Sequence, residues 1–148
     1  MKSKQIALTG IFAALYYVLG IVFQPISFMA IQCRIACALI PLIALFGYPA
    51  TIGITLGGLL FNANSPLGIL DMLSMLIFLP AKLAIQKWGI KAVPIHVAFV
   101  GIWVGYLLNI TFNAPLIPTI VTVAIGELVA EIVLGIPLNQ LVKRRLNK

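Results

Sequence analysis

Charged residues are scarce in this sequence of 148 amino acids: only 9% of them are charged, and only three are acidic. Soluble domains carry about a quarter charged residues, so a water-soluble globular domain is excluded. The single histidine and the two cysteines, Cys33 and Cys37, lack the spacing of a zinc site or a disulfide framework. We therefore expect no metal and no other cofactor, and we interpret both cysteines as small apolar packing residues.

Catalytic and nucleotide-binding motifs are also missing. The sequence contains neither GxxxxGKS nor GxxxxGKT, so the chain cannot hydrolyse ATP through a phosphate loop of that kind. It offers no Ser/His/Asp set, which makes an enzyme the least favoured class. The net charge of +7 comes from basic residues at the edges of apolar runs. That placement orients membrane proteins in the bilayer and argues against nucleic acid as a partner.

Hydrophobic residues make up 62% of the chain, and the mean hydropathy is +1.15. A single membrane-embedded domain over residues 1–148 is therefore predicted. Four apolar stretches, each about 17 to 25 residues long, can cross a bilayer as helices. They are residues 6–23, 69–85, 94–111 and 118–142. Residues 35–61 are interrupted by Gly47, Tyr48 and Pro49, and form either one kinked span or a hairpin of two short spans.

Basic residues decide between five spans and six. They form three clusters, which are Lys2 and Lys4, then Lys82, Lys87 and Lys91, then Lys143, Arg144, Arg145 and Lys148. With six spans all three clusters face the cytoplasm, whereas with five spans two of them lie outside. The sequence thus predicts an all-α bundle of six transmembrane helices with cytoplasmic N and C termini. His96, near the cytoplasmic end of its span, is expected at the membrane interface.

This topology places the polar stretch NANSPLGILD, residues 62–71, on the outer side together with Arg34. Ser65 is predicted to cap the next helix and Pro66 to be its first residue, so that Asp71 lies about 9 Å along it. Ionisable groups at membrane depth are costly, which favours a functional site over a purely structural Arg34–Asp71 pair. The predicted outward-facing depression is formed by Arg34, Asn62, Asn64 and Asp71.

The last two spans supply further candidates. Glu127 and Glu131 are four residues apart and share one helical face, so one of the two is expected to hold a proton. Trp103, Tyr106 and Asn109 follow one side of the preceding span, where aromatic rings suit a flat heterocycle or, more simply, a membrane interface. Pairs of small residues at 10/14, 53/57 and 101/105 permit close helix contacts within the bundle or with a partner.

These motifs together resemble one family. The segments IALTGIFAALYYVLG, PISFMAIQCRIACAL, NANSPLGILD and GELVAEIVLGIPL look like the queuosine-precursor transporter (QueT) family, in order from about Ile6 to Leu138. The resemblance implies the substrate-binding S component of an energy-coupling factor (ECF) transporter in the plasma membrane. Its implied partners are a transmembrane coupling subunit and two ATPase subunits, and its implied substrates are 7-deazaguanine precursors of queuosine.

Site residues carried over from the family fall on Gln32 and Arg34, on Asn64 (or Asn62) to Asp71, and on Glu127. The sequence departs from the family where Ala36 and Cys37 replace a Ser-Glu pair after the arginine, which leaves another modified base or vitamin-like molecule as an alternative substrate. Glu127 is expected to accept hydrogen bonds from the substrate, and Trp103 or Tyr106 to stack on it. Gly10 and Ala14 are expected to dock the coupling subunit. The rival interpretation is a membrane scaffold subunit without transport activity.

Overall fold

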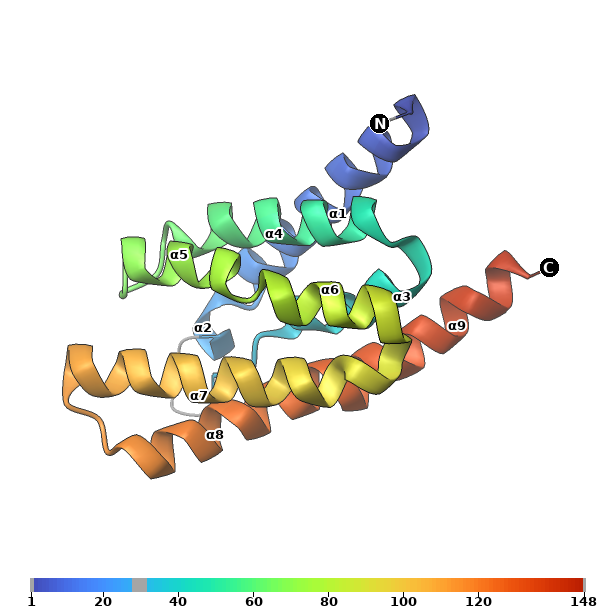
Figure 1. Ribbon diagram of the computed structural model, residues 1–148. Coiled ribbons are helices and arrows are strands. Elements are labelled where there is room, and N and C mark those ends of the chain that lie inside the picture. Colours follow the sequence, from blue (N-terminus) through green and yellow to red (C-terminus); the bar gives the residue numbers. More distant parts are fainter. Residues whose placement is uncertain (1, 28–31, 148) are drawn as a thin grey trace.

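The computed structural model describes residues 2–27 and 32–147, and every regular element within them is helical. Residues 28–31 of the predicted outer connection lie outside the described residues. Figure 1 shows the elements running back and forth along one direction. In chain order they are α1 (Ser3–Val22), α2 (Gln24–Ser27), η1 (Ile35–Leu42), α3 (Ile43–Phe46), α4 (Tyr48–Asn62), α5 (Ile69–Ile77), α6 (Leu79–Trp88), η2 (Gly89–Ala92), α7 (Val93–Phe112), α8 (Leu116–Leu128), η3 (Val129–Gly135) and α9 (Ile136–Leu146).

The first long helix packs along α4, and the two run in the same direction (Figure 1). Their backbones approach closely because Gly53 has no side chain. A Cβ atom at that position would lie 2.5 Å from the Thr9 carbonyl oxygen and 2.7 Å from Cβ of Phe12. A small residue is therefore required there, as expected for packing within a membrane bundle.

Residues 35–61 form the predicted hairpin rather than one kinked span. The chain runs through the 3₁₀ helix η1 and the short α3, reverses at Gly47 with a φ of +61°, and returns as α4. Glycine adopts this left-handed backbone without the steric penalty of a side chain. Pro49 stands at the start of α4, where its missing N–H has no helical partner to lose.

The predicted span at residues 69–85 contains a break. It consists of α5 and α6, which meet at Phe78, ahead of Pro80 in the first turn of α6. The predicted start of this span at Ser65 is wrong. Gly68 is the N-cap of α5, with a φ of +58°, while Ser65 and Pro66 lie in the preceding turn. Asp71 consequently lies in the first turn of the helix, and not about 9 Å along it as the sequence predicted.

The last two predicted spans match α7 and the continuous helical stretch α8–η3–α9. Helices α7 and α8 pack antiparallel, and Gly101 and Gly105 allow close contact with Ala124 and Ile120. Between α8 and α9 the stretch passes through η3, which is a π-helix of seven residues. Such irregular turns occur frequently at functional sites.

Three helical stretches are long and apolar enough to cross a membrane: Ser3–Val22, Ile69–Phe112 and Leu116–Leu146. The second of these reverses direction near Gly89 (Figure 1). Large apolar side chains point outward along the helices, with Ile69 and Ile117 each more than two-thirds exposed. All three acidic residues of the sequence are buried instead. A polar interior under an apolar surface is the pattern of a membrane-embedded protein.

Both described chain ends lie at the same end of the bundle, beside the α6–α7 turn (Figure 1). Lys87 and Lys91 are placed at this turn. The α4–α5 and α7–α8 connections and α2 lie at the opposite end. The basic residues of the two termini and of the turn therefore gather at one end of the molecule, as the predicted topology requires.

Candidate functional site

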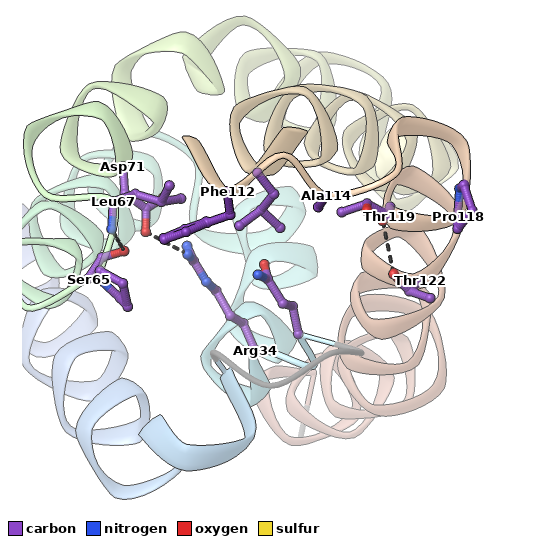
Figure 2. Close-up of a pocket in the computed structure, with 12 residues that line it drawn as sticks. Arg34, Ser65, Leu67, Asp71, Phe112, Ala114, Pro118, Thr119 and Thr122 are labelled. Atoms are coloured by element: carbon purple, nitrogen blue, oxygen red, sulfur yellow. Dashed lines mark hydrogen bonds and ion pairs between the residues drawn. The ribbon is translucent and has the colours of Figure 1, made fainter. Parts of the chain in front are cut away.

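A cavity of about 480 Å³ opens at the end of the bundle opposite the described chain ends. Its walls come from four places in the chain, as Figure 2 shows: the segment before η1, the α4–α5 turn with the start of α5, the end of α7, and the start of α8. The volume is typical of small-molecule sites. The lining residues are Gln32, Arg34, Ser65, Pro66, Leu67, Asp71, Leu108, Phe112, Ala114, Pro118, Thr119 and Thr122.

An ion pair lies in the wall of this cavity. The Arg34 Nη2 atom donates to Oδ2 of Asp71 at 2.9 Å, and both side chains are at most 5% exposed. The guanidinium also lies over the Phe61 ring, with Cζ 5.8 Å from the ring centroid. The predicted convergence of Arg34 and Asp71 is therefore present in the structure. Breaking one partner of such a buried pair leaves an uncompensated charge.

One acceptor of this pair lacks a donor. Oδ1 of Asp71 is buried and has no hydrogen-bond partner among the described residues. Asn62 supports the same helix start, since its Nδ2 atom donates to the Asp71 carbonyl oxygen at 2.8 Å. The side-chain oxygen of Asn62 is likewise buried without a partner in the described part of the chain. Asp71 lines the cavity, so its unmet acceptor matches a ligand that donates hydrogen bonds.

Of the remaining candidates near this end of the bundle, one lines the cavity and two do not. Gln32 lines the cavity, a position from which the predicted contact with substrate is possible. Asn64 is exposed, and its Nδ2 atom lies 3.5 Å from the Leu60 carbonyl oxygen, outside the cavity lining. Asn109 donates to the Ala114 carbonyl oxygen at 2.7 Å and thereby holds the α7–α8 turn. The structure thus gives Asn109 a supporting position next to the cavity wall.

The two aromatic residues that were predicted to stack on the substrate lie outside this cavity. Trp103 and Tyr106 have ring centroids 6.3 Å apart and line a separate apolar groove of about 240 Å³ on α7 and α8. The Trp103 indole donates to the Ser74 hydroxyl at 2.8 Å, which fixes α7 against α5. Neither ring lines the cavity that holds Arg34 and Asp71.

The aromatic ring in the cavity is Phe112, which sequence reasoning missed. It is the last residue of α7 and points toward the ion pair in Figure 2. The i, i+3 row of Trp103, Tyr106 and Asn109 continues to Phe112, so one further step would have found it. Thr119 and Thr122 of α8 add hydroxyl groups to the opposite wall.

Glu127 lies in a second cluster, deeper in the bundle and outside the cavity lining. Sγ of Cys37 and a carboxyl oxygen of each of Glu127 and Glu131 all lie within 4.8 Å of one another. Oε1 of Glu131 is 2.7 Å from Nδ1 of His96, and the Tyr16 hydroxyl is 3.4 Å from the Cys37 sulfur. The predicted shared face of the two glutamates is confirmed.

Two predictions about single residues are wrong. His96 was expected at the interface, but it is 1% exposed because Glu131 holds its ring inside the bundle. Lys82 was assigned to a cytoplasmic basic cluster, but it is also 1% exposed. Its Nζ atom donates to the Thr55 hydroxyl at 3.1 Å and approaches the Met75 sulfur at 3.6 Å. Cys37 contacts polar groups and is therefore more than an apolar filler.

The predicted pair of small residues in α1 is exposed, whereas the pairs in α4 and α7 are packed against other helices. Gly10 and Ala14 are exposed, and a Cβ atom at Gly10 would meet no described atom within 4 Å. Gly53 and Gly101, in contrast, are packed against neighbouring helices. The face with Gly10 and Ala14 is thus left uncovered by the described residues of the chain.

The comparisons with known proteins agree with this architecture. A sequence model of the family described as QueT transporter matches residues 6–144, nearly the whole chain. No curated protein and no solved structure matches the sequence. The family is one of transport proteins, and the apolar surface helices place the chain in a membrane. The chain therefore belongs to the QueT transporter family.

Proposed function

We propose that the chain is the substrate-binding S component of an ECF-type importer and binds a 7-deazaguanine precursor of queuosine from outside the cell. The observation that carries the proposal is the cavity of about 480 Å³ with the Arg34–Asp71 ion pair in its wall. Membership of the QueT transporter family supports a small-molecule substrate. Six spans in the plasma membrane, with the basic end cytoplasmic, would make this cavity face outward.

The chemistry of the cavity suits one edge of a deazaguanine. That edge offers a carbonyl oxygen beside a ring N–H and an exocyclic amine. Arg34 can donate to the carbonyl oxygen, while the unpartnered Oδ1 of Asp71 can accept from the N–H groups. Phe112 can stack on the ring, and Gln32 can both donate and accept.

This assignment moves the recognition carboxylate from Glu127 to Asp71. Glu127 does not line the cavity, whereas Asp71 does. Asn62 then acts by holding the start of α5 through its bond to the Asp71 carbonyl oxygen. This proposal assigns no substrate contact to the other candidates, because they do not line the cavity: Asn64, Trp103, Tyr106, Asn109 and Glu127. The sequence-based prediction that they contact substrate is untested, and alanine variants of each would test it.

Energy coupling comes from outside the chain in this proposal. The sequence has no phosphate loop, so a transmembrane coupling subunit and two ATPase subunits would supply the work. The exposed face with Gly10 and Ala14 is a suitable dock, since small residues permit close approach of a partner helix.

The direct test is to purify the chain in detergent and identify the small molecules that accompany it by mass spectrometry. A stoichiometric 7-deazaguanine supports the proposal. A different modified base or vitamin-like compound in the same cavity would keep the S-component function and change the substrate. Absence of any ligand, together with no saturable binding of added 7-deazaguanines, would contradict the proposal and favour a scaffold role.

A further inference from the structure

The internal cluster of Cys37, Glu127 and Glu131 carries an inference beyond the proposed function. We propose that these three residues bind one divalent transition-metal ion, such as Zn²⁺, inside the bundle. The thiol comes from η1, one carboxyl group from α8 and the other from the π-helix η3. Their potential ligand atoms lie within 4.8 Å of one another, and all three side chains are buried.

Two oxygens in this cluster have no hydrogen-bond partner among the described residues: Oε2 of Glu127 and Oε2 of Glu131. Both residues are at most 2% exposed, so bulk water does not supply donors. A buried carboxylate oxygen left in this way is costly and calls for a proton or a cation. A third buried polar atom of the region, Nε2 of His96, is also without a partner among the described residues.

His96 holds Glu131 in place. Its Nδ1 atom lies 2.7 Å from Oε1 of Glu131, so an ionised Glu131 accepts the Nδ1–H bond on one oxygen. That arrangement leaves the second oxygen of Glu131 for an ion. Orientation of a metal-binding group by a hydrogen bond from a neighbouring residue is usual in metal sites. His96 is a positioning residue in this proposal.

The ligand types select the metal. Thiolate and carboxylate together suit Zn²⁺, Fe²⁺ or Co²⁺, whereas Mg²⁺ and Ca²⁺ prefer oxygen ligands alone. Three protein ligands leave a fourth tetrahedral position for water. A divalent ion would offset two of the three negative charges carried by one thiolate and two carboxylates.

Such an ion would join two irregular elements of the bundle. The 3₁₀ helix η1 and the π-helix η3 pack against each other, and Gly135 allows the contact because a Cβ there would lie 2.8 Å from the Ala38 carbonyl oxygen. Asn139 ties the adjoining helix α9 to η1, since its Nδ2 atom donates to the Pro41 carbonyl oxygen at 2.6 Å. The metal would add a coordination link at this junction, and its binding energy would add to stability.

The test measures metal content and cobalt spectra of the purified full-length protein. We expect about one Zn²⁺ per chain by elemental mass spectrometry, and a thiolate-to-cobalt charge-transfer band after replacement with Co²⁺. Cys37→Ser should abolish the band and lower metal affinity at least about tenfold. Cys33→Ser is the matched control, because Cys33 lies four residues earlier and outside the cluster, and it should retain both.

Glu127→Gln provides a second, nearly isosteric variant that should also lose affinity while remaining monodisperse, in case Cys37→Ser does not fold. Wild-type protein without stoichiometric metal and without a cobalt band would overturn the proposal, and would mean that a proton occupies the carboxyl pair. Equal spectra of the two cysteine variants would overturn it as well. Titration with a 7-deazaguanine tests the proposed function separately from metal binding, since none of the three metal-binding residues lines the outer cavity.

Discussion

Variants of the Arg34–Asp71 ion pair can show whether these residues bind the ligand or only stabilise the fold. Its two charged groups are 2.9 Å apart and almost inaccessible to water. We consider three variants: Asp71→Asn and Arg34→Met, which keep approximate shape, and the double variant. Each single change strands one buried charge and should lower the free energy of unfolding by about 3–5 kcal/mol. The double variant removes both charges and should recover most of that loss.

Affinity should follow a different pattern from stability. If both groups contact the ligand, each single change weakens binding by about 1–3 kcal/mol, or about 5- to 150-fold. The double variant then regains stability but not affinity, because the ligand still lacks its donor and its acceptor. A purely structural pair predicts instead that the stable double variant binds like the parent.

The assay combines thermal unfolding in detergent with calorimetric titration of a 7-deazaguanine. Asn64→Ala is the control, since Asn64 is a polar residue of the neighbouring turn that does not line the cavity. It should change neither quantity appreciably. A double variant with recovered stability and parental affinity would refute the binding role of Arg34 and Asp71.

Four further predictions concern individual elements. Phe112→Ala should weaken ligand binding by about 1–3 kcal/mol through lost stacking, whereas Tyr106→Ala should not; calorimetry showing the reverse order would restore the sequence-based aromatic assignment. Glu127→Gln should leave ligand affinity within about twofold, and a larger loss would return Glu127 to the site. Gly10→Leu combined with Ala14→Leu should abolish cellular uptake of labelled substrate but preserve binding, and undiminished uptake would exclude that face as the dock. Gly53→Ala should destabilise the chain by about 1–3 kcal/mol in thermal unfolding because its Cβ meets the Thr9 carbonyl oxygen, while Gly10→Ala, with open space around it, should not; equal stabilities would refute the tight α1–α4 contact.

Hydropathy and the positions of helix-breaking residues were enough to predict most helices. Apolar runs located α1 and α7, and the Gly47 turn was visible as a helix-breaking triplet. The start of α5 was misplaced because a Ser-Pro pair resembles a helix start, while the actual cap is Gly68 with its positive φ. A residue's local pattern does not show which of two adjacent turns the tertiary structure will use.

The positions of the ionisable side chains were harder to predict than the positions of the helices. Lys82 fits a cytoplasmic cluster by spacing to Lys87, yet it turns inward to the Thr55 hydroxyl. His96 is similarly drawn inside by Glu131, which is 35 residues away in the sequence. Arg34 and Asp71 were expected to meet because both had to avoid lipid at the same end of the bundle. Pairings between distant segments depend on packing, which periodicity alone does not contain.

The most direct test of the proposed function is a titration of the purified chain with a 7-deazaguanine and with its analogue lacking the exocyclic amine. Thr122→Trp, which fills the cavity from α8, serves as the blocked variant. The account predicts saturable binding of the parent compound at one site, binding weaker by orders of magnitude for the des-amino analogue, and loss of binding in Thr122→Trp. Undiminished affinity in Thr122→Trp, or equal affinity for the two compounds, would contradict it.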